Sequence, residues 1–125
     1  MNLTLTNLTK QYGSFTALQN FNYEFTAGVY GLLGPNGAGK STLMNIITDN
    51  LKATSGLVRF DGEDITKMDA DFRKILGFMP QQQGIYPNFT LERFLYYMVA
   101  LKGMKKADAK PQIEKLINLV NLQDS

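Results

Sequence analysis

The residues of this chain that could do chemistry are concentrated in one glycine-rich segment, Gly34–Thr42, with the sequence GPNGAGKST. The segment fits the spacing G-x-x-x-x-G-K-[S/T]. Phosphate oxygens must approach the main chain closely, so glycine is favoured, and successive backbone N–H groups can then point at the anion. A helix that begins here would add its free N–H groups and the positive end of its dipole. The pattern therefore predicts a phosphate cradle.

Two side chains of this segment suit a nucleoside triphosphate and its metal ion. Lys40 offers a point charge to the β- and γ-phosphates, and the Ser41 hydroxyl can be a magnesium ligand. The other residues expected to contact the nucleotide are Gly34, Pro35, Asn36, Gly37, Ala38, Gly39 and Thr42. The alternative is a glycine-rich turn with an incidental lysine. An apolar run before the segment and an amphipathic one after it favour the cradle.

The elements that must position this segment follow from the spacing of apolar residues. Leu and Thr alternate over residues 3–10, which predicts a strand with one apolar face, and a second strand rich in aromatics is predicted over 15–25. The run GVYGLL at 28–33 predicts a third strand, buried on both faces. After Lys40 the spacing becomes helical, with apolar residues at Leu43, Ile46, Ile47 and Leu51.

The second part of the chain alternates short strands and helices. An Asp-Gly pair at 61–62 predicts a short hairpin, and a brief helix is expected to begin at Asp69. The run ILGFM at 75–79 predicts another strand. Thr90 can cap a helix that ends near Leu101. The last predicted helix places four apolar residues on one face, namely Ile113, Leu116, Ile117 and Val120. This order predicts an α/β fold with an antiparallel portion at its start.

Composition excludes several functional classes. The 125 residues are 44% apolar and 19% charged, with a net charge of +2, which is typical of a globular protein and gives no argument for nucleic acid as a partner. There is no cysteine and no histidine, so the sequence contains neither a histidine base nor a thiolate metal site. The most apolar run, residues 94–104, is shorter than the roughly 20 residues of a membrane span.

Several motifs in this order resemble the ATP-binding subunits of ABC transporters. GPNGAGKST resembles the Walker A motif of ABC-type ATPases, LTKQYGSFTAL their first strand and A-loop, and SGLVRFDGEDI their next hairpin. Residues 76–103 look like the family's Q-loop and the start of its helical subdomain. The resemblance implies an α/β P-loop NTPase fold, here the N-terminal part of one ABC-type ATP-binding domain over residues 1–125. It implies an antiparallel β subdomain at 1–30, a P-loop core with a partial central sheet at 31–80, and the Q-loop with a partial helical subdomain at 81–125.

The resemblance also implies roles for two residues outside the glycine-rich segment. Tyr12 matches the aromatic residue that stacks on adenine, and a flat ring suits that task; a surface tyrosine at a strand end is the alternative. Gln81 matches the Q-loop glutamine, which reaches magnesium and the attacking water in the family. We therefore expect Lys40 and Gln81 to be catalytic and Ser41 and Gln81 to bind the metal. The neighbouring Gln82 and Gln83 are interpreted as solvated loop residues.

The resemblance further implies partners. Tyr86, Pro87 and Phe89 are apolar residues in a turn that either pack inward under the helices or line a groove for a transmembrane transporter subunit. A second ATP-binding subunit is expected in a full-length dimer. The implied location is cytoplasmic, peripheral to the inner face of the cell membrane through the membrane partner, and direct contact with nucleic acid is not expected.

The motifs that complete hydrolysis in this family are not found in the sequence. It contains no signature of the LSGGQ type, no Walker B strand with its catalytic glutamate, and no switch histidine. We expect ATP and Mg²⁺ to bind without efficient hydrolysis by these residues alone, within the ATPase subunit of an ABC transporter, with export favoured by the resemblance of residues 86–103. The alternatives are a DNA- or ribosome-acting ABC-type ATPase, or a nucleotide-binding fragment without turnover.

Overall fold

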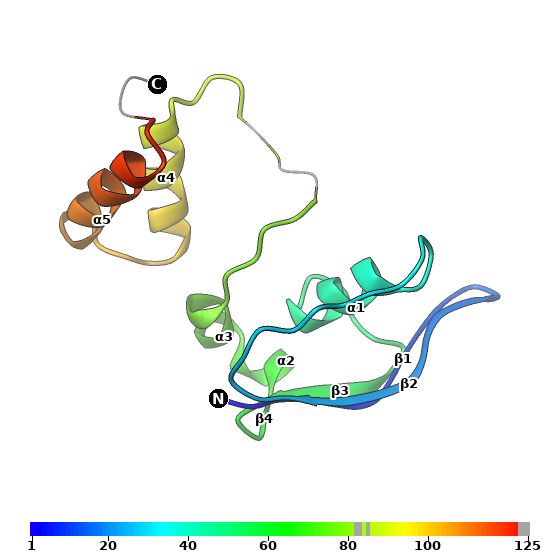
Figure 1. Ribbon diagram of the computed structural model, residues 1–125. Coiled ribbons are helices and arrows are strands. Elements are labelled where there is room, and N and C mark those ends of the chain that lie inside the picture. The colour runs from blue at the N-terminus through cyan, green and yellow to red at the C-terminus, as the bar shows by residue number, and fades with distance from the viewer. Residues whose placement is uncertain (82–83, 85, 123–125) are drawn as a thin grey trace. The chain divides into compact units, whose positions relative to one another are not determined.

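Two units make up the chain, Met1–Leu76 and Gly77–Ser125. The protein is described by a computed structural model that covers residues 1–81, 84 and 86–122. Figure 1 shows strands and short helices in the first unit and a pair of helices in the second. Each unit is described by itself below.

A four-stranded antiparallel sheet is the base of the first unit (Figure 1). Its strands are β1 (Leu3–Tyr12), β2 (Phe15–Phe25), β3 (Ser55–Phe60) and β4 (Glu63–Asp64), in the order β2-β1-β3-β4. The two N-terminal strands and the later hairpin are therefore confirmed. Asp61 and Gly62 join β3 to β4 with φ angles of 48° and 89°, the left-handed backbone that tight hairpin turns require.

An irregularity in β1 keeps its leucines on one face. Leu5 and Leu8 are both buried although three positions separate them, because the register shifts between them and Asn7 adopts a φ of 50°. Opposite this bulge lies Gly56, where a Cβ would be 2.4 Å from the Asn7 carbonyl oxygen. The remaining buried members of this core are Leu18, Leu43, Ile46, Val58, Ile65 and Phe72.

Helix α1 (Lys40–Ile47) lies over one face of the sheet (Figure 1). It contributes Leu43 and Ile46 to the core, as the helical spacing predicted. The helix ends before Leu51, which is half-buried beyond the last turn. Two short helices follow the hairpin, α2 (Ile65–Met68) and α3 (Ala70–Ile75). Only the second of these was predicted.

Two predicted strands are not formed. Residues 28–33 and 75–79 are not paired with any strand in the described part of the chain, and residue 75 belongs to α3. The side chains of Val29 and Leu33 are 103% and 93% exposed, so the first run is not buried on both faces. An apolar run shows that a segment could be buried, but a strand forms only where a neighbouring strand accepts its hydrogen bonds. The predicted partial central sheet is therefore absent from the described residues.

The second unit contains α4 (Leu91–Leu101) and α5 (Lys106–Leu119). The Thr90 hydroxyl oxygen accepts a hydrogen bond from the Arg93 N–H at 3.3 Å, which confirms the predicted cap. In α5 Ile113 is buried, but Leu116 is 51% exposed and Val120 follows the last turn, so the predicted apolar face is only partly correct. Among the described residues, no helix has the length and apolar character needed to cross a membrane.

Candidate functional site

The glycine-rich segment forms the loop that leads into α1. Gly37 and Gly39 have φ angles of 85° and 80°, a left-handed conformation that glycine adopts without steric cost. Gly39 also lies directly against β2, since a Cβ there would be 2.3 Å from the Ala17 carbonyl oxygen. Two constraints therefore favour glycine at position 39, namely its left-handed backbone angle and the close approach of β2.

The N-terminal end of α1 offers unpaired donors. The first hydrogen bond within the helix runs from the Leu43 N–H to the Gly39 carbonyl, at 2.9 Å. The N–H groups of Lys40, Ser41 and Thr42 precede that bond and have no partner within the helix. No acidic residue stands in the first turn of α1 to offset the positive end of the dipole. This end of the helix therefore favours an anion.

Lys40 lies folded over the loop that precedes it. Its Nζ donates to the Gly34 carbonyl at 2.6 Å and to the Pro35 carbonyl at 2.7 Å. The Ala38 N–H also donates to the Pro35 carbonyl, at 3.2 Å, and closes the turn. An ammonium group has three donors and can exchange a carbonyl for a stronger, charged acceptor. The positive charge is thus held at the centre of the segment that the sequence predicted to bind phosphate.

Ser41 is the residue of this loop expected to bind a metal ion, and that role stays a prediction. It is exposed in the first turn of α1, directly after Lys40, while Thr42 is half-buried. No group of three or more acidic or other metal-binding side chains occurs in the described residues. A magnesium ion at Ser41 would therefore take phosphate oxygens and water among its other ligands, as magnesium commonly does.

Gln81 lies outside the unit that contains this loop. Gln81 is exposed and belongs to the second unit, whereas Lys40 and Ser41 belong to the first. Its pairing with Ser41 at a metal ion stays a prediction. Gln82 and Gln83 lie outside the described residues.

Tyr12 is the last residue of β1 and is 47% exposed. It pairs with Phe15, two residues before Ala17, whose carbonyl is the close neighbour of Gly39. The β1–β2 turn and the glycine-rich loop therefore lie at the same end of the sheet (Figure 1). The Lys10 Nζ is 5.1 Å from the centroid of the Tyr12 ring. The ring is available on this side of the loop, and its stacking on a base stays a prediction.

Tyr86 and Phe89 pack on α4 in an aromatic cluster. Their ring centroids are 5.1 Å apart, and the Tyr86 ring is 5.6 Å from that of Tyr97. A side-chain hydrogen bond with Tyr86 raises the pKa of the Tyr97 hydroxyl above its ordinary value. The ring contacts of Tyr86 and Phe89 agree with inward packing for these two residues, but Tyr86 is still 46% exposed and Pro87 is exposed, so the choice between the two interpretations stays open.

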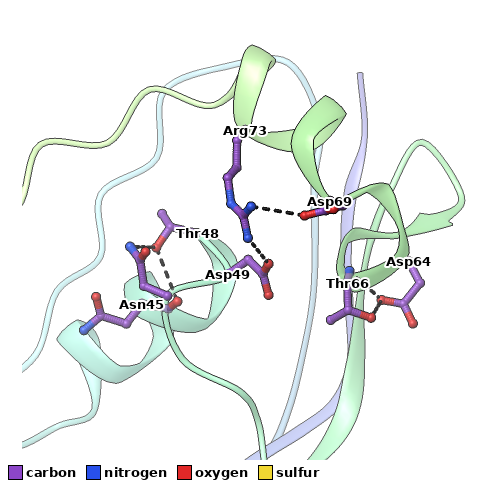
Figure 2. Close-up of polar contacts among 8 residues, drawn as sticks. Asn45, Thr48, Asp49, Asp64, Thr66, Asp69 and Arg73 are labelled. Carbon is purple, nitrogen blue, oxygen red and sulfur yellow. Dashed lines mark hydrogen bonds and ion pairs between the residues drawn. The ribbon is translucent and has the colours of Figure 1, made fainter. Parts of the chain in front are cut away.

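Sequence reasoning missed how the carboxylates around the short helices are used. Asp64 caps α2, because its carboxylate accepts hydrogen bonds from the Thr66 N–H at 3.0 Å and the Thr66 hydroxyl at 2.7 Å. The hydrogen bond from the Thr66 hydroxyl lowers the pKa of Asp64 most, and the bond from the Thr66 N–H lowers it further. The signal was present as an Asp two residues before a Thr. Asp69, expected to cap α3, makes no such bond and instead accepts from Arg73 at 3.1 Å (Figure 2).

Comparison with known proteins fits this geometry. Residues 18–125 match the family model described as ABC transporter. The probable sulfate/thiosulfate import ATP-binding protein CysA of Chlorella vulgaris is 32% identical over 98% of this chain and 52% of its own length. The probable multidrug ABC transporter ATP-binding protein YbhF of Escherichia coli (strain K12) is 33% identical over 93% of this chain and 20% of its own.

A solved structure, the dimer of the bacterial ABC transporter cassette MJ0796, superposes with a TM-score of 0.79 at 28% identity. It covers 98% of this chain, which spans 58% of that cassette. The chain thus covers only about half the length of the first of these relatives, at 52%. Because the family model matches well over half of its residues, this chain belongs to the ABC transporter family, and its fold is that of the family's ATP-binding cassettes.

Proposed function

We propose that this chain binds ATP with magnesium through residues 34–42, as part of the ATPase subunit that powers an ABC transporter. One observation carries the proposal most directly. The Lys40 Nζ is held inside the glycine-rich loop by two carbonyls, 2.6 and 2.7 Å away, next to the free N–H groups that begin α1. A cation and a helix N-terminus meet in this loop, and both favour phosphate oxygens.

The residues of the loop, together with Tyr12 and Gln81, have separate tasks in this proposal. Lys40 exchanges its carbonyl partners for β- and γ-phosphate oxygens, and the N–H groups of the loop and the first turn of α1 hold the phosphates. Ser41 contributes a hydroxyl oxygen to magnesium, which when bound neutralises part of the phosphate charge. Tyr12 stacks on adenine from the same end of the sheet. Gln81 completes the metal site.

We further propose that these residues bind ATP without turning it over efficiently. Phosphoryl transfer depends on groups placed around the γ-phosphate and the attacking water. The sequence contains no histidine, no LSGGQ-type signature and no Walker B strand. In the family these groups complete the site, together with a second ATP-binding subunit. An ATPase assay of this chain that gave turnover comparable to a complete cassette would contradict this part.

In this proposal the protein lies at the inner face of the membrane, where it is bound to a transmembrane transporter subunit. In this proposal Tyr86, Pro87 and Phe89 contact the transmembrane subunit, and the exposure of Tyr86 at 46% supports that use. Export is favoured by the resemblance of residues 86–103 to exporters. The relatives include one named for sulfate/thiosulfate import. Transport assays of the complete protein with its membrane partner would decide the direction.

Nucleotide affinity tests the central proposal. We expect the full chain to bind ATP in the presence of magnesium, and Lys40→Ala to weaken binding by roughly 10- to 100-fold, because charge-assisted hydrogen bonds are lost. The matched control is Lys115→Ala, which removes the same charge from α5 in the second unit. Isothermal titration calorimetry measures all three proteins.

The control separates local chemistry from net charge. If Lys40→Ala and Lys115→Ala weaken binding equally, the effect is electrostatic and general, and the cradle is not supported. If neither the wild-type chain nor Lys40→Ala binds ATP, the proposal fails for this chain. A Ser41→Ala variant should reduce the dependence of affinity on magnesium more than the affinity for ATP alone.

A further inference from the structure

The two ends of α1 differ in how their charges are balanced. The N-terminal end has no acidic residue in its first turn, which leaves the positive end of the dipole for an anion. The C-terminal end has no basic residue in its last turn, and Asp49 follows it two residues after Ile47. A carboxylate at the negative end of a helix is unfavourable unless a cation from elsewhere offsets it.

Arg73, on α3, supplies that cation (Figure 2). Its Nη2 is 3.5 Å from the Asp49 Oδ2, and its Nη1 is 3.1 Å from the Asp69 Oδ1. Figure 2 shows the guanidinium group between the two carboxylates, one from the end of α1 and one from the α2–α3 corner. The Asp49 side chain is only 18% exposed, so its charge is partly removed from water and its partner matters more than at an open surface.

Both aspartates are held by unusual backbone angles. The φ angles of Asp49 and Asp69 are 56° and 45°, in the left-handed region that non-glycine residues enter at a cost. Asp69 stands at the start of α3 but uses its carboxylate for Arg73 rather than for capping. Two local conformations that are each unfavourable thus direct two carboxylates at one guanidinium group.

The end of α1 has little freedom to move away from this contact. Thr48 is buried, and its hydroxyl donates to the Met44 carbonyl at 2.9 Å and accepts from the Asn50 Nδ2 at 2.9 Å. On the other side, α3 is anchored by the buried Phe72, whose ring is 6.1 Å from that of Phe60. Arg73 therefore joins two elements that are each fixed to the core.

We propose that Arg73 is a positioning residue that couples occupation of the loop at residues 34–42 to α3 and to the segment Gly77–Gln81 that follows it. The proposal rests on the ATP binding proposed above. A phosphate at one end of α1 pulls on a helix whose other end is held by Asp49 and Arg73. The chain leaves the first unit directly after α3, so a shift or stiffening of α3 is passed to the residues that follow.

Hydrogen exchange of the full chain with and without MgATP tests the coupling. In the wild-type chain we expect MgATP to slow amide exchange in residues 34–47 and also in residues 70–81. In Arg73→Ala the first effect persists at saturating MgATP, while the slowing in 70–81 falls by roughly threefold or more. Arg73→Lys restores part of it, because the charge returns without the fork geometry.

The matched control is Lys74→Ala. Lys74 is the next residue of α3, is similarly exposed, and forms a 2.7 Å ion pair with Asp71 inside the same helix. Within the described part of the chain it joins no second element, so its loss should leave the response of 70–81 unchanged. If Arg73→Ala and Lys74→Ala give the same response as the wild type, the coupling role is overturned. It is equally overturned if Arg73→Ala reduces the response of both segments together, since that is a general loss of structure.

A measurement without nucleotide keeps the two proposals separate. Asp49→Asn and Arg73→Ala should each speed amide exchange in α3, and the double variant should be no faster than Arg73→Ala alone, because Arg73→Ala already lacks the contact with Asp49. Additive effects would overturn the positioning role whatever ATP does. If the wild-type chain shows this coupling but MgATP slows no exchange in residues 34–42, the proposed ATP binding fails and the link between α1 and α3 stands.

Discussion

The two units of this chain have similar proportions of apolar residues but bury them to different extents. In the first, strands and helices that are distant in sequence share one core, and Leu8 is 0% exposed at its centre. In the second unit, α4 is an amphipathic helix but none of its residues is buried, and α5 buries only Ala109 and Ile113. Amphipathic spacing predicts which face can be buried, but burial itself requires an element that covers the face.

The difference also separates the two proposed tasks. The glycine-rich loop rests on β2 and begins a helix that is part of the first core, so its geometry is set by tertiary contacts. The aromatic turn at Tyr86 and Phe89 is held mainly by rings on the neighbouring helix α4. A site for phosphate needs donors fixed in place, whereas a surface that meets a partner can be completed by that partner.

The largest expected effect comes from removing a central side chain of the first unit. Leu8→Ala should lower the free energy of unfolding by about 3 kcal/mol, because it leaves a cavity under the sheet. Its counterpart in the second unit is Leu119→Ala, at a position 73% exposed, which should change stability by less than about 0.5 kcal/mol. Urea unfolding followed by circular dichroism gives both values. Equal effects would erase the contrast between the units.

A pair of glycines in the loop sharpens the same contrast at shorter range. Gly39→Ala should destabilise the first unit by about 2–3 kcal/mol, since a left-handed φ of 80° is combined with a Cβ 2.3 Å from the Ala17 carbonyl oxygen. Gly37 also has a left-handed φ of 85°, but no atom lies within 4 Å of a Cβ added there. Gly37→Ala should therefore lower the free energy of unfolding by only about 1 kcal/mol. Thermal or urea unfolding of the two variants compares them. A larger cost at Gly37 would mean that the loop does not rest on β2 as described.

The smallest effect is expected in the aromatic turn, where the measured quantity is the pKa of Tyr97. Tyr86→Phe removes the hydrogen bond that raises the Tyr97 pKa, so this pKa should fall back toward its ordinary value of 10.0. Because the folded-state pKa is raised, the contact contributes its full stability below the unfolded-state pKa. This contribution is lost as the pH rises through the higher folded-state pKa. Ultraviolet difference titration of tyrosine measures the change. An unchanged Tyr97 titration in Tyr86→Phe would show that the contact is not formed in solution.

Much of the fold could be predicted because it depends on local pattern. Alternation in β1, the Asp-Gly turn at 61–62 and the Thr90 cap each involve neighbours in sequence, and each was correct. The strands at 28–33 and 75–79 were wrong, because an apolar run cannot state which strand will accept its hydrogen bonds. The bulge at Asn7 was also not predicted, and it lies against Gly56, which belongs to a strand far away in sequence.

The sequence by itself determined the loop chemistry. The glycines, Lys40 and Ser41 stand within eight residues, and a helix must follow them, so their types and spacing were enough to predict a phosphate cradle. Only the tertiary structure decided what lies around that cradle. It placed β2 against Gly39, turned Tyr12 to the same end of the sheet, and set Arg73 at the far end of α1. These contacts join residues up to dozens of positions apart, and only the packing of the sheet, α1 and α3 around one core fixes the distances between them.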